Sequence, residues 1–212
     1  LLSSPFRAEF EREFGGYLFH ELEEQTKLLN PAIIEDRIEQ SNLVQQYQKT
    51  TAMCHTTFRG EECNFYGLLK HMQSVDRAER KEAFEAWAKM YEEVAPQLDA
   101  QYASLVKLRA GMAKKLGMDN YIQMAYLSKR RYNYGPEDVA QFRKQVKEII
   151  VPACAEIYER QRQRLGIDKL HYYDEALIFP EGNAIPEGDK DALVAAAQKM
   201  YRELSPETGE FF

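Results

Sequence analysis

The sequence has few of the residues that end helices. Only 11 of its 212 residues are glycine and 8 are proline, which is less than the usual combined share of about 12%. Sandwiches and barrels built from short strands need a turn about every 8–12 residues, and glycine and proline supply many of those turns. The composition therefore favours a helical protein over a β-sandwich or a β-barrel.

Cysteines and long apolar runs are also scarce. The three cysteines, Cys54, Cys63 and Cys154, are an odd number without a short-spaced repeat, which argues against a secreted disulfide framework. The chain lacks an uninterrupted run of about 18–20 apolar residues, and its amino terminus lacks a basic patch followed by an apolar stretch. These absences predict a cytoplasmic protein that does not cross a membrane.

The sequence has no excess of positive charge. Its 28 Lys and Arg residues stand against 34 Asp and Glu residues, which gives a formal charge of −6. Nucleic acids and anionic membranes are usually bound through a basic face, so neither is expected as a partner. With 44% hydrophobic and 29% charged residues, the chain is expected to fold around a core without needing disulfides or a metal.

Apolar residues recur at spacings of three and four along most of the chain, as in amphipathic helices. This spacing predicts a helix over residues 77–116, which Pro96 should kink or divide. A second long helix is predicted between Gly135 and Gly166, with Pro152 inside it. The predicted fold class is all-α, with long kinked helices in a bundle-like lobe that forms a single helical unit over residues 1–212.

Residues 52–66 change to the alternating pattern of strands. A two-residue loop at Arg59-Gly60 would make a β-hairpin with one buried side. The expected cross-strand pairs are Phe58 with Glu61, Thr56 with Cys63, and Cys54 with Phe65. In this register Cys54 and Cys63 are diagonal, so buried thiols are favoured over a disulfide. His55 points to the other face, which disfavours a Cys/His metal cluster.

The segment His20-Glu21-Leu22-Glu23-Glu24 is similar to the zinc-peptidase pattern in which two histidines lie on adjacent turns of a helix. Its fifth residue, Glu24, stands where that pattern has the second histidine, and no third ligand is suggested nearby. We therefore expect His20 to be a solvated residue on an acidic helix face. The sequence contains no glycine-rich nucleotide loop and no nucleophile motif of the acyl-enzyme type.

Residues 167–189 form a long irregular stretch, with a polar aromatic cluster, His171-Tyr172-Tyr173-Asp174, near its start. Loops of this length are uncommon in compact helical proteins and are often functional. Tyrosine hydroxyls can stabilise an oxyanion, but tyrosines are used more commonly for packing against a helical layer. From the residues alone, both uses remain open.

Helix-start signals recur at the very end of the chain. Ser205-Pro206-Glu207 has a cap residue, a proline at the first helical position and an acidic residue in the first turn. Only six residues follow this proline, and a helix of that length is marginal alone. We therefore expect the sequence to be an internal piece of a longer chain, cut where a helix begins.

Short motifs in a fixed order along nearly the whole chain resemble the oligoendopeptidase F branch of the thimet-oligopeptidase family. No one motif is diagnostic, but their order and spacing together are specific. The motifs are Ser4-Pro5-Phe6-Arg7, Gly16-Tyr17-Leu18, Gln73-Ser74, Asp76-Arg77, Arg80, Phe142-Arg143, Val151-Pro152, Glu159-Arg160-Gln161-Arg162, Leu165-Gly166-Ile167-Asp168-Lys169-Leu170, Tyr172-Tyr173-Asp174, Gly182-Asn183, Pro186, Lys199-Met200-Tyr201 and Glu203-Leu204-Ser205-Pro206-Glu207-Thr208. The chain departs from the family at Asn133, where relatives often have an acidic residue.

The resemblance implies a zinc metallopeptidase that cleaves short peptides inside a deep channel between two mostly helical lobes. In such enzymes an HExxH helix supplies two histidine ligands and a glutamate base, and a later glutamate supplies the third ligand. These residues lie downstream of the part that resembles this chain. Residues 1–212 are therefore expected to hold no catalytic residue and no zinc, and to be inactive alone.

In the intact enzyme this segment would wall the channel and position the peptide. The candidate substrate-binding residues are Tyr172, Tyr173, Asp174, Arg131 and Tyr134. The expected partners are oligopeptide substrates and the remaining catalytic half of the same chain, and an apolar face meant for that half would favour self-association. The alternative is a self-sufficient helical module that binds a peptide or a protein without catalysis.

Overall fold

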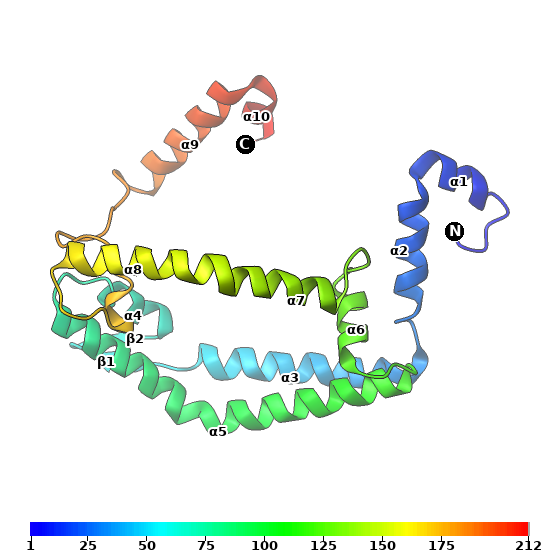
Figure 1. The fold of residues 1–212 in the computed structure, drawn as a ribbon, viewed down its shortest axis with the longest axis horizontal. Helices are drawn as coiled ribbons and strands as arrows, with labels where there is room; N and C mark the ends of the chain where they lie inside the picture. Colours follow the sequence, from blue (N-terminus) through cyan, green and yellow to red (C-terminus); the bar gives the residue numbers. More distant parts are fainter. Residues whose placement is uncertain (212) are drawn as a thin grey trace.

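The computed structural model describes residues 1–211, and most of them are helical (Figure 1). The all-α prediction with one small hairpin is confirmed. The α-helices are α1 (Arg7–Phe14), α2 (Gly16–Thr26), α3 (Ile34–Ala52), α4 (Phe65–His71), α5 (Arg77–Lys115), α6 (Tyr121–Ser128), α7 (Pro136–Gln145), α8 (Val151–Leu165), α9 (Lys190–Leu204) and α10 (Pro206–Phe211). The other elements are the strands β1 (Thr56–Phe58) and β2 (Glu61–Cys63), the 3₁₀ turns η1 (Pro31–Ile33) and η3 (Tyr172–Asp174), and the π turn η2 (Val146–Ile150).

The long helix α5 begins where Asp76 caps it, because the Asp76 carboxylate accepts a hydrogen bond of 3.0 Å from the backbone N–H of Ala78. Pro96 lies inside the helix and removes one backbone donor, which loosens the helix without ending it. Figure 1 shows α5 bending along its length. The prediction of one long helix with a proline kink is therefore confirmed.

Helices α7 and α8 form one rod through the π turn η2 (Figure 1). The π turn directly precedes α8, whose second residue is Pro152. A wider turn relieves the clash between a proline ring and the carbonyl four residues earlier. The rod ends at Gly166, which adopts the left-handed conformation with φ of +66°.

The hairpin has the predicted loop and the predicted register. Phe58 pairs with Glu61 and Thr56 pairs with Cys63. The third expected pair, Cys54 with Phe65, is wrong because Phe65 begins α4. The side chain of Asn64 caps that helix by accepting a 2.8 Å hydrogen bond from the Gly67 N–H, and this local cap stops the strand earlier than the alternating pattern indicated.

Most of the buried apolar residues form two clusters, one toward each end of α5. The cluster at the hairpin end contains Cys54, Phe58, Cys63, Leu68, Met72, Ala83 and Met90. The cluster at the other end contains Leu28, Ile33, Met112 and Met124. All three cysteines are free thiols: Cys54 and Cys63 are buried, as predicted, and Cys154 is exposed.

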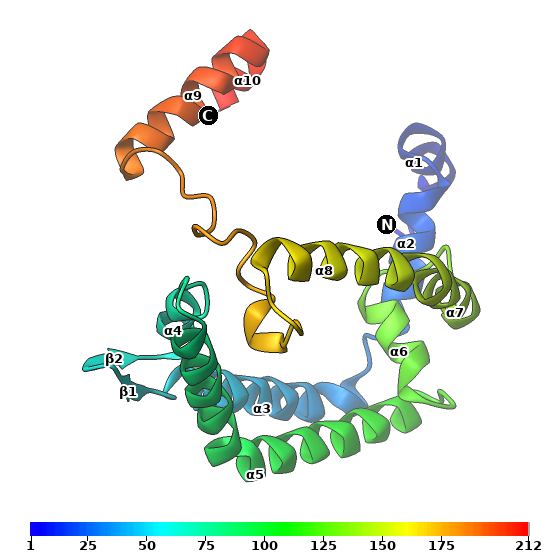
Figure 2. The ribbon, with the colours of Figure 1, turned by 60° about the vertical axis from the view of Figure 1, so that its left-hand side comes forward.

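The elements make an open frame (Figures 1 and 2). Helices α3 and α5 run side by side, α6 joins them to the α7–α8 rod at one end, and the segment with η3 returns to α5 at the other. Along the rod only Gln161 is buried, while α9 and α10 stand apart from the frame. Among residues 1–211, no helix combines the length and the apolar character that a bilayer crossing requires.

Candidate functional site

The five predicted substrate-binding residues fall into two groups. Tyr172, Tyr173 and Asp174 form η3, after the carboxyl end of α8, and Arg131 and Tyr134 lie in the loop before α7. The α7–α8 rod between these loops is about 45 Å long at a rise of about 1.5 Å per residue. The structure therefore does not bring the two groups together (Figure 1).

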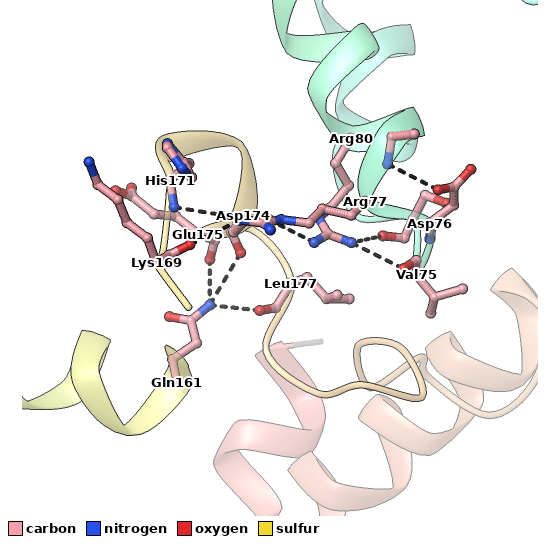
Figure 3. A network of polar contacts seen from close by, with 12 residues as sticks. Val75, Asp76, Arg77, Arg80, Gln161, Lys169, His171, Asp174, Glu175 and Leu177 are labelled. Carbon is pink, nitrogen blue, oxygen red and sulfur yellow. Dashed lines mark hydrogen bonds and ion pairs between the residues drawn. The ribbon is translucent and has the colours of Figure 1, made fainter. Parts of the chain in front are cut away.

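Asp174 is fully buried and is clamped by two arginines of α5 (Figure 3). Arg77 donates to both carboxylate oxygens, from Nε to Oδ1 at 3.1 Å and from Nη2 to Oδ2 at 2.9 Å. The buried Arg80 donates from Nη2 to Oδ1 at 2.8 Å. The backbone N–H of His171 also donates to Oδ2, at 3.0 Å. This clamp fixes η3 against the start of α5.

The electrostatics of the clamp favour an ionised carboxylate. Burial raises the pKa of the Asp174 carboxyl, but hydrogen bonds from Arg77, the His171 N–H and Arg80 outweigh burial and hold that pKa below its usual value. The same contact raises the pKa of Arg77. Because the partners of this carboxylate belong to the chain itself, the geometry favours a positioning role for Asp174 over direct contact with a peptide.

Gln161 of α8 holds the segment that follows η3 (Figure 3). This buried side chain donates from Nε2 to the backbone oxygens of Leu177 at 2.6 Å, Glu175 at 3.1 Å and Asp174 at 3.4 Å. A buried carbonyl that lost its donor would cost free energy, so Gln161 ties the loop to the rod. From the sequence, Gln161 was recognised only as part of a motif, and this contact was not predicted.

The two tyrosines of η3 have different surroundings. The Tyr172 side chain is 58% exposed, and its ring centre lies 4.3 Å from that of Phe84. The Tyr173 ring stacks on His171 at 5.1 Å, and the Arg77 guanidinium carbon lies 5.7 Å from the Tyr173 ring centre. Tyr172 is therefore the residue of η3 that is most available to a ligand.

Arg131 and Tyr134 lie together beside the start of α7. The Arg131 guanidinium carbon lies 5.3 Å from the ring centre of Tyr126 and 6.0 Å from that of Tyr134. A hollow of about 450 Å³ opens here, lined by Arg131, Tyr134, Asp138, Val139 and Phe142. It combines an apolar wall with one cationic and one anionic group, so it can accept an apolar side chain beside a polar backbone group.

His20, the residue of the zinc-peptidase-like segment, is exposed and lies edge-on to Tyr132, with ring centres 5.7 Å apart. Among residues 1–211, one group of three His, Cys or carboxylate side chains could hold a metal ion, and it does not include His20. That group is Glu61, Cys63 and His71. This group was not predicted from the sequence, because His55 is the histidine within the predicted hairpin and His71 lies outside it.

Comparison with known proteins gives a consistent result. The family model of peptidase family M3 matches residues 70–178. Two solved structures described as oligoendopeptidase F are similar over the whole chain: one at 44% identity and a TM-score of 0.95, the other, from Bacillus anthracis, at 40% identity and a TM-score of 0.92. A structure of Pz peptidase A with an inhibitor is similar at 43% identity and a TM-score of 0.95. The chain spans 37%, 39% and 38% of these three structures, respectively. No curated protein matches it.

Proposed function

The chain belongs to peptidase family M3, and from that membership we propose that it is the helical, channel-lining part of a zinc metalloendopeptidase that hydrolyses short oligopeptides. One observation carries the proposal: the chain is similar over its full length to 37% of an oligoendopeptidase F structure, at 44% identity. We also propose a cytoplasmic location, because Cys54, Cys63 and Cys154 are all free thiols, and unpaired cysteines are usual in reducing compartments.

The proposed catalytic zinc does not fit the residues of this chain that come nearest to the family pattern. Residues 1–212 contain no HExxH motif, and His20 and Glu24 are not part of the one three-ligand group described above. The zinc ligands and the glutamate base would therefore come from the rest of the enzyme. In such an enzyme a bound zinc ion activates water and polarises the scissile carbonyl.

The residues of this chain would contribute positioning. Tyr172 would present its exposed ring and hydroxyl to the peptide, and Tyr173 would support it from η3. Asp174 would hold η3 in place through Arg77 and Arg80, which donate to its carboxylate at 2.8–3.1 Å. At the other end of the rod, the hollow beside Arg131 and Tyr134 would receive a peptide side chain.

We expect the 212-residue chain to leave a quenched oligopeptide uncleaved, and the enzyme that contains both this segment and a downstream HExxH helix to cleave it. Within that enzyme, Arg131→Gln should raise KM more than it lowers kcat, because it removes a binding contact and no reacting group. The measurement is steady-state hydrolysis with the zinc-loaded enzyme.

The matched control for Arg131→Gln is Arg130→Gln. Arg130 is the neighbouring residue, but it is exposed and pairs with Glu21 at 3.0 Å, so its loss should leave KM unchanged. Zinc-dependent hydrolysis by the 212-residue chain alone would contradict the proposal. Full-affinity peptide binding by that chain, with no catalytic helix encoded downstream, would favour the non-catalytic binding module.

We further propose that the exposed apolar face of the α7–α8 rod packs against the remaining half of the enzyme. Ile149 and Ile157 are both more than half exposed there, and exposed apolar patches of this kind mark interaction surfaces. The isolated chain should therefore self-associate, and replacing Ile149 and Ile157 by serine should shift it toward monomer in sedimentation velocity. Ile185→Ser, at an exposed loop residue, is the control and should change nothing.

A further inference from the structure

His71, at the end of α4, has one ring nitrogen engaged and the other free. Its Nδ1 lies 2.6 Å from Oε1 of Glu79, and Glu79 also accepts a hydrogen bond from the Ser74 hydroxyl at 2.8 Å. The Nε2 atom is buried and has no hydrogen-bond partner. Buried polar atoms are rarely left in this state, so the vacant Nε2 calls for an explanation.

The His71 ring lies close to a thiol and a carboxylate. Single ligand atoms of Glu61, Cys63 and His71 lie within 4.8 Å of one another, and Glu61 Oε2 is 3.9 Å from His71 Nε2. Glu61 and Cys63 are two residues apart in β2 and therefore lie on the same face of the hairpin. The Cys63 thiol is buried and unpaired.

The local sequence brings α4 close to Cys63. Gly67 lies in the first turn of α4, and a Cβ at this position would stand 3.3 Å from Cys63 Cβ and 3.4 Å from its Sγ. Phe58 packs against the His71 ring, with their ring centres 4.9 Å apart, and forms an apolar wall beside the three ligand groups. The hairpin and α4 are thus packed so that the three ligand groups converge at one edge.

We propose that Cys63, His71 and Glu61 form a zinc site in which the Cys63 thiolate, His71 Nε2 and a Glu61 carboxylate oxygen bind the ion and water completes the tetrahedron. Sulfur, imidazole and carboxylate ligands in this number suit Zn²⁺. Ligands at about 2.0–2.3 Å from one zinc ion lie within about 4 Å of each other. Glu61 is exposed, so a small rotation of its side chain closes the site.

Glu79 is the carboxylate that contacts Nδ1 of His71, the ring nitrogen that would not bind the ion. A histidine that ligates a metal almost always donates its other N–H to a carboxylate or a carbonyl, which fixes the tautomer and the ring orientation. Glu79 is itself held by Arg59 at 3.2 Å. With its Nδ1–H donated to Glu79, the neutral imidazole carries its free lone pair on Nε2, which lies 3.9 Å from Glu61 Oε2.

Charge also favours a divalent ion. A thiolate and a carboxylate together carry the two negative charges that one Zn²⁺ neutralises, and the thiol proton leaves to solvent on binding. Lys70 is the cation that already contacts Glu61, at 2.5 Å. A ligating carboxylate is commonly hydrogen-bonded by an outer group, so Lys70 keeps this contact when the ion binds.

The test is titration of the metal-free 212-residue chain with Co²⁺, followed by displacement with Zn²⁺. We expect one equivalent to bind, with the charge-transfer absorption of a cobalt–thiolate bond, and Zn²⁺ to abolish this absorption. The variants Cys63→Ser and His71→Gln should each lose it. Glu79→Gln should keep the absorption and weaken metal affinity by about 10–100-fold.

Two control variants separate this site from other cysteines and histidines. Cys154→Ser changes an exposed thiol on α8 and His55→Gln changes an exposed ring beside the hairpin, so both should bind as the parent chain does. If Cys63→Ser loses the far-ultraviolet circular dichroism of a folded helical protein, Glu61→Gln, at an exposed position, replaces it in the test. This variant should weaken metal binding. Absence of the thiolate absorption, or its loss in Cys154→Ser alone, would overturn the proposal. Peptide hydrolysis does not enter this test, so its outcome is independent of the proposed peptidase function.

Discussion

Replacing Asp174 by alanine should lower the free energy of unfolding by about 3–5 kcal/mol, since it removes one partner of a buried ion pair and leaves the other charge uncompensated. Arg80 is only 2% exposed and would keep its charge in the interior. The change also removes the acceptor for Arg77 and for the His171 N–H. Urea unfolding followed by circular dichroism measures the effect.

Asp168→Ala is the matched control for this prediction. Asp168 also approaches Arg77, at 3.9 Å, but its side chain is 90% exposed, and exposed ion pairs contribute little to stability. The unfolding midpoint of this variant should stay close to that of the parent chain. Equal losses for the two variants would mean that the clamp on Asp174 does not hold η3 in place.

The pH dependence of the same variant provides a second readout. The folded pKa of Asp174 lies below its usual value, so the carboxylate contributes stability that is fully present above the unfolded pKa of about 3.9. This contribution is lost as pH falls through the folded pKa. The stability difference between the parent chain and Asp174→Ala should therefore be constant at neutral pH and shrink below about pH 4.

The sequence predicted the features that depend on neighbours along the chain. The hairpin register follows from the two-residue loop at Arg59-Gly60, and the kinked α5 follows from apolar spacing with Pro96 inside. The error at Phe65 is also local: the Asn64 cap, which accepts from the Gly67 N–H, started a helix where alternation predicted a strand.

Contacts between distant segments were not predictable in this way. The motif residues Arg77 and Arg80 were recognised, but nothing in their spacing indicates that they meet Asp174, which lies 97 and 94 residues later. Glu79 shows a subtler case. Glu79 stands three residues after the cap residue Asp76, a spacing typical of a capping box, but in the structure its carboxylate accepts hydrogen bonds from Ser74 and His71 instead.

Leu68→Ala should be the other strongly destabilising change, with an expected loss of about 2–5 kcal/mol, because truncating a buried leucine removes apolar contacts and leaves a cavity. Leu68 is 0% exposed and belongs to the cluster that joins the hairpin and α4 to α5. It precedes His71 by one helical turn, so loosening α4 would also displace the imidazole. The measurement is again urea unfolding.

Leu69→Ala supplies the control, because it makes the same chemical change one residue later on the same helix. Leu69 is 44% exposed, so its truncation leaves no closed cavity and should cost much less. If both variants lost the same stability, the buried face of α4 would not be what holds this helix against α5. If only Leu68→Ala is destabilised, the hairpin-end cluster is the element that keeps Cys63, Glu61 and His71 close together, and metal binding should weaken in that variant alone.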